Sequence, residues 1–185
     1  GSMTPETKVA RAWVPGHITG FFAAQRREES PRLSGSIGAG LCLSLGAATA
    51  AQAAPDLERT EILLNGIASE APVSRFVAER LAVGRGPVRL ETDLKMPFGA
   101  GFGASGAGAL GAAYALSSCF ELGLTADQAA AVAHGAEVTL RTGLGDVIAQ
   151  NCGGLVVRLE PGAPGTGRID RIPVPPVPIS YVVRG

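Results

Sequence analysis

The sequence has few cysteines and no net charge, and both shortages exclude classes of protein. Cys42, Cys119 and Cys152 are the three cysteines of a 185-residue chain. Because they are odd in number and far apart, they predict neither a disulfide framework nor a metal site, and a reducing cytoplasm is the expected location. Sixteen basic residues balance sixteen acidic ones. Without a basic excess or a dense basic cluster, we expect no nucleic-acid partner.

Hydrophobic runs of the membrane-spanning kind are also missing. Residues 33–55 and 96–120 are long uncharged windows, but they consist largely of Gly, Ala and Ser rather than Leu, Ile and Phe. Insertion of such side chains into a bilayer would gain little free energy. We therefore expect no membrane partner and interpret both windows as the buried centre of a soluble domain. The length suits one domain with a core, or a domain plus a fragment.

What the sequence does contain is a series of strand and helix patterns. Strands are predicted at residues 8–14, 33–45, 61–64, 88–94, 155–159 and 179–183. Helices are predicted at residues 72–83, 105–122 and 125–140. Pro72 suits a first helical turn, and Thr125 with Gln128 forms a capping box. Strands that come early and helices that come later favour an α+β fold.

The two ends of the chain differ in composition from its middle. Gly1 and Ser2 before Met3 are typical of the remnant of a cleaved tag, so residues 1–3 are left out of the fold. Residues 4–160 are expected to form one domain. Six prolines fall between residues 161 and 178. We interpret residues 161–185 as a proline-rich linker and the start of a truncated second domain.

The most informative segment is the glycine-rich stretch 97–108, between the predicted strand 88–94 and the helix from Ser105. Glycine permits positive φ and lets a ligand approach the backbone without meeting a Cβ. Backbone N–H groups at such a turn, beside a helix N-terminus, bind phosphate. The candidate phosphate-binding residues are Pro97, Gly99, Gly101, Phe102, Gly103, Ala104, Ser105, Gly106 and Ala107. A glycine-rich turn in front of a packing helix is the alternative.

Two familiar phosphate motifs do not account for this segment. No lysine follows Gly106, so the segment is not a P-loop. Gly101, Gly103 and Gly106 satisfy the G-x-G-x-x-G spacing of dinucleotide-binding folds. Such a fold also needs an acidic residue about twenty positions later, after a second strand. Glu121 is near that distance, but it closes the same predicted helix.

A second group of polar residues lies near the end of the third predicted helix. His134, Glu137 and Arg141 are three and four positions apart and share a helix face. The helix leads into a flexible loop, residues 142–146, that presents the carboxylate of Asp146. Phosphoryl transfer needs phosphate positioning, a metal site and a group that activates the attacking hydroxyl. A solvated helix surface and a turn aspartate are the alternatives.

The string from Pro97 to Ala107 resembles the second signature of the GHMP kinases, which phosphorylate small alcohols. The second serine of that signature is kept as Ser105, and Ala104 replaces the first. Three further motifs, which follow in the right order, resemble the same family: residues 14–22, 35–43 and 142–147. Within the family, the resemblance is strongest to the archaeal branch that phosphorylates pantoate, and it extends over about residues 9–160.

This resemblance implies the N-terminal, nucleotide-binding domain of a GHMP kinase, with ATP and Mg²⁺ as cofactors. The implied fold is α+β, with a mixed sheet, helices on one face and a left-handed βαβ crossover. The glycine-rich stretch would hold the nucleotide, Ser105 and Glu137 the magnesium ion, and Asp146 would accept the substrate proton. In mevalonate-kinase-like members the two acidic positions lie slightly farther apart than Glu137 and Asp146 do here.

The implied reaction moves the γ-phosphoryl group of ATP to the primary hydroxyl of pantoate, on an archaeal route to coenzyme A. His17 stands where many family members have a lysine or arginine, which favours pantoate over sugars and mevalonate, although a lone histidine at a strand end is commonly structural. The candidate substrate-binding residues are His17, Thr19, Arg32, Ser36 and Arg141. A kinase of the homoserine or mevalonate type and a non-catalytic binding module are the alternatives. A homodimer is also considered.

Overall fold

The long strand β2 (Gly35–Ala53) organises the sheet of this protein, as seen in a computed structural model that describes residues 7–27 and 29–182. Along one edge, β2 pairs in antiparallel orientation with β1 (Ala10–Gln25). Along the other edge, the second half of β2 pairs with β5 (Val88–Leu94) and the first half with β6 (Leu155–Glu160). Strands from the two ends of the chain are therefore joined through one central strand.

The remaining strands extend the sheet at its two edges. β3 (Glu61–Leu64) pairs in parallel with β5 and in antiparallel orientation with β4 (Ile67–Ala68). β7 (Arg168–Ile172) pairs in antiparallel orientation with β6. Over the described residues the sheet has seven strands in the order β4-β3-β5-β2-β6-β7, with β1 beside β2. One parallel pair among antiparallel ones makes this a mixed sheet.

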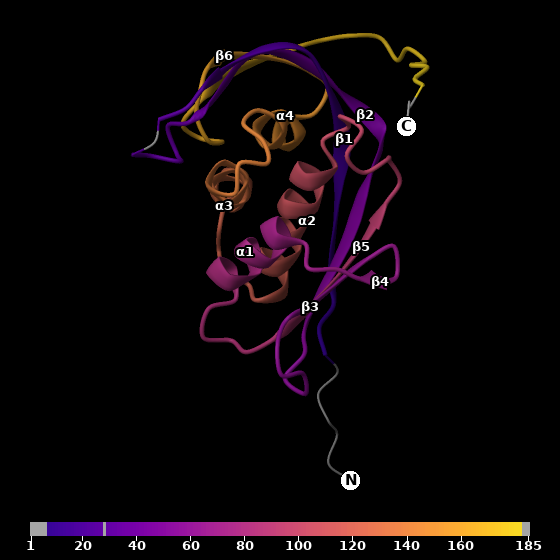
Figure 1. Cartoon of the computed structure of the whole chain (residues 1–185), viewed down its shortest axis with the longest axis vertical. Coiled ribbons are helices and arrows are strands. Elements are labelled where there is room, and N and C mark those ends of the chain that lie inside the picture. Colours follow the sequence, from indigo (N-terminus) through magenta and orange to yellow (C-terminus); the bar gives the residue numbers. More distant parts are fainter. Residues whose placement is uncertain (1–6, 28, 183–185) are drawn as a thin grey trace.

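Helices cover one face of the sheet (Figure 1). In the described chain they are α1 (Pro72–Leu81), α2 (Ala104–Cys119), α3 (Ala126–Thr139) and α4 (Asp146–Cys152). The innermost helix is α2, which packs against β1, β2 and the other three helices. Twelve of its sixteen residues are buried, which explains why residues 96–120 carry no charge.

Small side chains let α2 lie close to the sheet. At Gly111 a Cβ would lie 2.5 Å from the hydroxyl oxygen of Thr49 on β2, so a larger residue would force the helix and the sheet apart. Thr49 is buried and shares a hydrogen bond of 3.0 Å with Thr92 on β5. The two hydroxyls hydrogen-bond to each other, so neither oxygen is buried without a partner, which would cost free energy.

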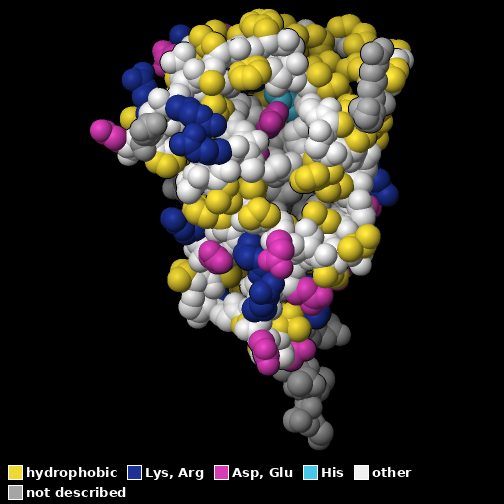
Figure 2. Space-filling model, in the orientation of Figure 1, with side chains coloured by type: hydrophobic (Ala, Val, Ile, Leu, Met, Phe, Trp, Pro, Cys, Tyr) yellow, Lys and Arg dark blue, Asp and Glu magenta, His cyan; other side chains and the backbone are white. Residues whose placement is uncertain are grey.

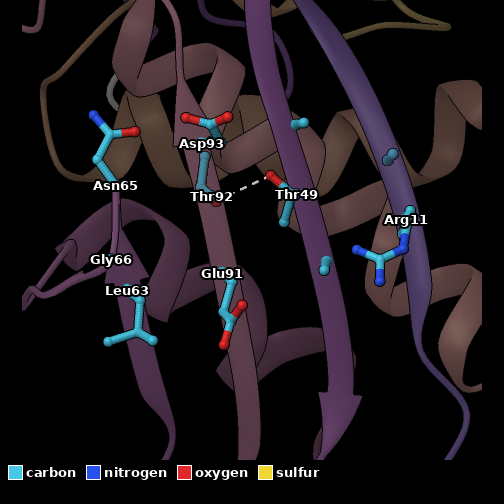
Figure 3. A pocket seen from close by; sticks show the side chains of 11 residues that line it. Arg11, Thr49, Leu63, Asn65, Gly66, Glu91, Thr92 and Asp93 are labelled. Carbon is cyan, nitrogen blue, oxygen red and sulfur yellow. Dashed lines mark hydrogen bonds between the residues drawn. The ribbon is translucent and has the colours of Figure 1, made fainter.

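The helices leave the opposite face of the sheet open in the described structure. Figure 3 shows a hollow there, of about 520 Å³, across β1, β2, β5 and β3. Arg11 lies on one side of it and Glu91 and Asp93 on the other, with small residues of β2 between them. The hollow has no residue of the glycine-rich stretch 97–108 in its lining and is a separate feature of the surface.

The α+β fold expected from the sequence is confirmed. The predicted strands at 61–64 and 88–94 coincide with β3 and β5. The three predicted helices correspond to α1, α2 and α3 within a few residues. The parallel pair β3–β5 is linked through α1 and is the βαβ unit that the family resemblance implies. The left-handed crossover of that unit stays a prediction.

Several elements differ from the expectation, and they include β2, which extends to Ala53 beyond the predicted end at residue 45, and the short β4, which was not predicted. β1 extends to Gln25, well beyond the predicted 8–14, because β2 provides a partner along the whole hairpin and register shifts after Pro15 and Thr19 absorb the irregular residues. The short elements α4 and β7 were not predicted. The predicted strand at 179–183 was wrong over residues 179–182, which form no strand, and Val183 lies outside the described residues.

The ends of the chain add two points. The predicted tag remnant, residues 1–3, lies outside the described residues. The predicted division after residue 160 stays a prediction, with β7 continuing the sheet beyond it. Each helix in the described part of the chain is too short or too polar to cross a membrane.

The capping box at α3 allows a direct test of how that helix begins. The hydroxyl of Thr125 accepts from the backbone N–H of Gln128 at 3.1 Å, and the Gln128 side chain accepts from the backbone N–H of Thr125 at 2.9 Å. Thr125→Ala should lower the free energy of unfolding by about 1 kcal/mol in urea denaturation. The control is Thr139→Ala, at the exposed end of the same helix. An equal loss in both variants would contradict a specific role of the cap.

Candidate active site at the glycine-rich stretch

The glycine-rich stretch connects β5 to α2 and takes a path that only glycine follows without strain. Gly99, Gly101 and Gly103 have φ values of 74°, 82° and 67°. Gly103 is the N-cap of α2 and has no side chain to satisfy the first N–H groups of the helix. Those groups are open to a ligand, and the positive end of the helix dipole favours an anion. This part of the structure agrees with the geometry predicted for a phosphate loop.

A cavity of about 780 Å³ lies over this stretch. Its lining comes from the loop, from Ser105 at the start of α2, from the first residues of α1, and from Thr142 and Asp146. The face of the molecule seen in Figure 2 is hollowed in its upper half, with acidic and histidine side chains visible inside the hollow. The cavity is large enough for a nucleotide-sized ligand.

Asp146 is the first residue of α4 and is held by His17 on β1. The Oδ1 atom of Asp146 lies 2.7 Å from the Nδ1 atom of His17. His17 is completely buried, and its backbone N–H donates to the carbonyl of Phe102 at 3.0 Å, so the same residue also supports the glycine-rich stretch. The Asp146 side chain keeps 28% of its exposure and can be reached from the cavity. The arrangement presents an oriented carboxylate to a bound ligand.

Glu137 on α3 is a buried carboxylate at the back of the site. Its Oε2 atom accepts hydrogen bonds from the hydroxyls of Ser105, at 2.8 Å, and Thr142. Its Oε1 atom is buried and has no hydrogen-bond partner among the described residues. Burial raises the pKa of Glu137, the charge of Asp146 acts in the same direction, and the two hydroxyl donors oppose them. A cation next to the orphaned oxygen would offset the cost of burying this charge.

The donor set fits magnesium better than a metal that needs a cage of protein ligands. The described residues contain no cluster of three or more His, Cys, Asp and Glu side chains. Mg²⁺ is commonly held by one or two carboxylates together with waters and substrate phosphates. Glu137, with Ser105 beside it and Asp146 nearby, offers oxygen donors that could hold Mg²⁺ in this way.

Arg158 on β6 is a functional candidate that was not predicted. It is 3% exposed, and its Nε atom donates to the hydroxyl of Ser36 at 3.0 Å. One guanidinium nitrogen, NH1, is buried without a hydrogen-bond partner among the described residues. Burial lowers the pKa of Arg158, and the negative charge of Asp146 partly restores it. Arg158 shares a strand face with the buried Val156, and this alternation was a signal that could have identified it.

The structure brings some of the predicted substrate-binding residues together and leaves others outside. His17 and Ser36 lie in the site, through Asp146 and Arg158. Thr19 is half-buried on β1, opposite Gly40. Two arginines do not line the cavity: Arg32 is exposed and donates to the hydroxyl of Thr166 at 3.3 Å, and Arg141 is exposed after the end of α3. Their sequence positions were close to the motifs, but their side chains point elsewhere.

His134 has a structural role. Its Nε2 atom lies 2.7 Å from the carbonyl oxygen of Ser34, and burial lowers its pKa, so the neutral ring donates this hydrogen bond. Ser34 in turn hydrogen-bonds with the backbone of Arg27. His134 therefore fastens the turn between β1 and β2 to α3. The alternative of a solvated helix face is wrong for His134 and Glu137, which are both buried, whereas Arg141 is exposed but lies after the end of the helix.

The raised pKa of Glu137 predicts a pH-dependent effect on stability. As the pH rises above 4.5, the ordinary value for this group, the unfolded chain loses its proton before the folded chain does, so folding loses stability until the pH passes the raised pKa. Glu137→Gln removes this loss. In a buffer without divalent cations, the free energy of unfolding of Glu137→Gln should therefore rise relative to that of the parent protein as the pH rises. Glu79→Gln, at an exposed position on α1, is the control. A difference in free energy of unfolding between Glu137→Gln and the parent protein that stays constant with pH would contradict the prediction.

Comparison with known proteins places the chain in a family. Residues 71–154 match the model of the GHMP kinases N terminal domain. The pantoate kinase of Thermococcus kodakarensis is 44% identical over 169 residues, which cover 88% of this chain and 55% of that protein. The pantoate kinase of Methanospirillum hungatei is 36% identical over 160 residues, which cover 83% and 54%. The chain spans about half the length of these curated relatives.

A solved structure agrees with these matches. A protein described as a phosphotransferase related to the CoA biosynthesis pathway superposes with a TM-score of 0.83 at 42% identity, over 90% of this chain and 58% of that one. The residues that match the family model include the glycine-rich stretch, α3 and α4. The chain therefore belongs to the GHMP kinase family and contains its N-terminal domain.

Proposed function

We propose that this protein is a kinase that transfers the γ-phosphoryl group of ATP to the primary hydroxyl of pantoate. The observation that carries the proposal is the placement of Asp146, oriented by His17, beside an uncapped phosphate loop in one cavity. The similarity to pantoate kinases at 44% and 36% identity supports the choice of substrate. We further propose that it acts in the cytoplasm, on a route to coenzyme A.

The nucleotide would occupy the cavity over the glycine-rich stretch. GHMP kinases use ATP, and the open N–H groups at the start of α2 suit its phosphates. The adenine ring would lie along the first turn of α1, which lines the same cavity. Ser105 and Glu137 would hold Mg²⁺. Mg²⁺ held there would supply positive charge that offsets the negative charge developing on the phosphates during transfer.

Asp146 would act on the acceptor alcohol. Its carboxylate, oriented by the hydrogen bond from His17, accepts the hydroxyl proton as the oxygen attacks the γ-phosphorus. His17 cannot rotate away, because it is completely buried and tied through its backbone to Phe102. A fixed carboxylate lowers the cost of reaching a productive geometry.

Arg158 and Ser36 would bind the carboxylate of pantoate. A guanidinium group presents paired N–H donors to a carboxylate, and Arg158 has a buried nitrogen without a partner among the described residues. Asp146 lies close enough to Arg158 for its negative charge to affect the pKa of Arg158. One site therefore offers a group for each end of a small hydroxy acid. The methyl groups would meet the apolar side chains of Phe21, Phe22 and Ile37, which are exposed on the β1–β2 hairpin. The predicted roles of Thr19, Arg32 and Arg141 have less support.

Two other functions fit the same family. One is a kinase of the homoserine or mevalonate type, and the other is a module that binds a nucleotide without turnover. The buried Arg158 suits a carboxylate, which pantoate, homoserine and mevalonate all carry, so it does not separate these acceptors, whereas the His17–Asp146 pair favours catalysis over simple binding. A homodimer stays an open proposal for the assembly.

Replacing the proposed base tests the mechanism. In the protein expressed from its complete reading frame, Asp146→Asn should lower kcat by about a hundredfold to ten-thousandfold, because an amide of the same shape cannot take the proton. Binding of a non-hydrolysable ATP analogue, measured by calorimetry, should change little. A drop in kcat of less than about threefold would remove Asp146 from the chemical step.

The acceptor preference tests the substrate. With ATP and Mg²⁺ in excess, kcat/KM for pantoate should exceed that for mevalonate and homoserine by at least about a hundredfold, because a site built to pair one acid leaves polar groups unpaired with another. The assay follows ADP release with each acceptor in turn. Comparable values for mevalonate or homoserine would favour the alternative kinases, and no ADP release with any acceptor would favour a binding module.

A further inference from the structure

We propose that Gln150 is a positioning residue that fixes the distance between the phosphate loop and Asp146. The inference rests on the proposed function and names a residue that the motifs of the sequence do not include. Gln150 lies on α4, four positions after Asp146, so the two side chains leave the same face of the helix. It is 4% exposed, which makes it one of the few fully buried polar side chains of the site.

The carboxamide of Gln150 holds the backbone of the loop. Its Nε2 atom donates to the carbonyl oxygen of Gly103 at 2.9 Å. The same oxygen accepts the backbone N–H of Ala107, also at 2.9 Å, which is the first hydrogen bond of α2. Gln150 is therefore attached to the residue at which the loop becomes a helix. Any movement of α4 is transmitted to the N–H groups that face the phosphate site.

The orientation of this carboxamide is determined by its surroundings. Rotating it by half a turn would place Oε1 against the carbonyl oxygen of Gly103, so Nε2 must face Gly103. Oε1 then points to Gly106, where a Cβ would lie 2.7 Å from it. The glycine at position 106 leaves the space that the Gln150 side chain fills. Oε1 is buried and has no partner among the described residues, so packing rather than a second hydrogen bond holds that end.

Gln150 consequently links the two halves of the reaction. Asp146 at the start of α4 meets the acceptor alcohol, and the loop that ends at Gly103 meets the donor phosphate. One side chain spans between the helix of the first and the backbone of the second. A displacement of about 1 Å between reacting groups can cost about a hundredfold in rate. Loss of this link should therefore affect the turnover rate more strongly than it affects the free energy of unfolding.

The neighbouring Asn151 is a matched control. It lies on the same helix, is partly buried and also makes side-chain hydrogen bonds, donating to Asp127 at 2.8 Å and accepting from the hydroxyl of Tyr114. These bonds join α4 to α2 and α3 on the side away from the loop. Loss of this side chain should therefore lower stability without moving the phosphate site.

The test compares Gln150→Leu with Asn151→Leu in the protein expressed from its complete reading frame. Gln150→Leu keeps the volume and removes the donor, and it should raise KM for ATP about tenfold and lower kcat by at least as much. Asn151→Leu should lower Tm and leave kcat and both KM values within about twofold. If Gln150→Leu lowers Tm but leaves kcat and KM unchanged, Gln150 is merely structural and the proposal is wrong.

A second variant approaches the same contact from the loop. Gly106→Ala places a Cβ 2.7 Å from Oε1 of Gln150 and 3.2 Å from Oε1 of Glu137, and the closer contact should push the carboxamide off Gly103. It should reproduce the rise in KM for ATP, and the double variant Gly106→Ala with Gln150→Leu should be no worse than the more severe single one. If the two substitutions instead raise KM for ATP independently, so that their factors multiply in the double variant, the proposal is wrong.

The design separates this inference from the proposed function. Pantoate turnover by the parent protein tests the function, whereas the ratio between variants tests Gln150. If the parent binds a non-hydrolysable ATP analogue but turns over no acceptor, the proposed function fails and the Kd of the analogue replaces KM as the readout. A Kd about tenfold weaker in Gln150→Leu, with Asn151→Leu unchanged, would still support the link. Equal Kd values would refute it.

Discussion

The close contact between α2 and the sheet is the constraint on which the site depends. A helix in which nine of sixteen residues are glycine or alanine can lie directly on β1 and β2, and Gly111 leaves no room for anything larger beside Thr49. This position places the N-terminus of α2 next to His17 on β1 and brings α3 and α4 within reach of the same point. Larger side chains on α2 would move the glycine-rich stretch away from His17 and Asp146.

The site is a buried polar cluster whose members depend on one another. His17 orients Asp146, the hydroxyls of Ser105 and Thr142 hold one oxygen of Glu137, and Gln150 holds Gly103. Several atoms in this cluster are buried without partners among the described residues, which is costly in a protein that binds nothing. A cation beside Glu137 and a carboxylate beside Arg158 would satisfy two of these atoms, in line with the function we propose.

Much of this protein was predictable because its key features are local. The glycine-rich stretch lies between β5 and α2 as expected, the capping box begins α3, and the α+β class follows from the order of the elements. Where prediction failed, the cause was a contact between distant segments. β1 is long because β2 offers it a partner, and Arg32 does not line the cavity but donates a hydrogen bond to Thr166, 134 residues later.

The sequence by itself determined the backbone of the glycine-rich stretch, because positive φ values and an uncapped helix start are properties of a short run of glycines, and it determined which carboxylates were available. Only the tertiary structure decided which of them meet. Nothing local relates His17 to Asp146, or Arg158 to Ser36, or Gln150 to Gly103, since these pairs are 129, 122 and 47 positions apart. The packing of α4 and β6 against β2 and α2 brings these residues into contact. Their burial then gathers ordinary polar side chains in one candidate site.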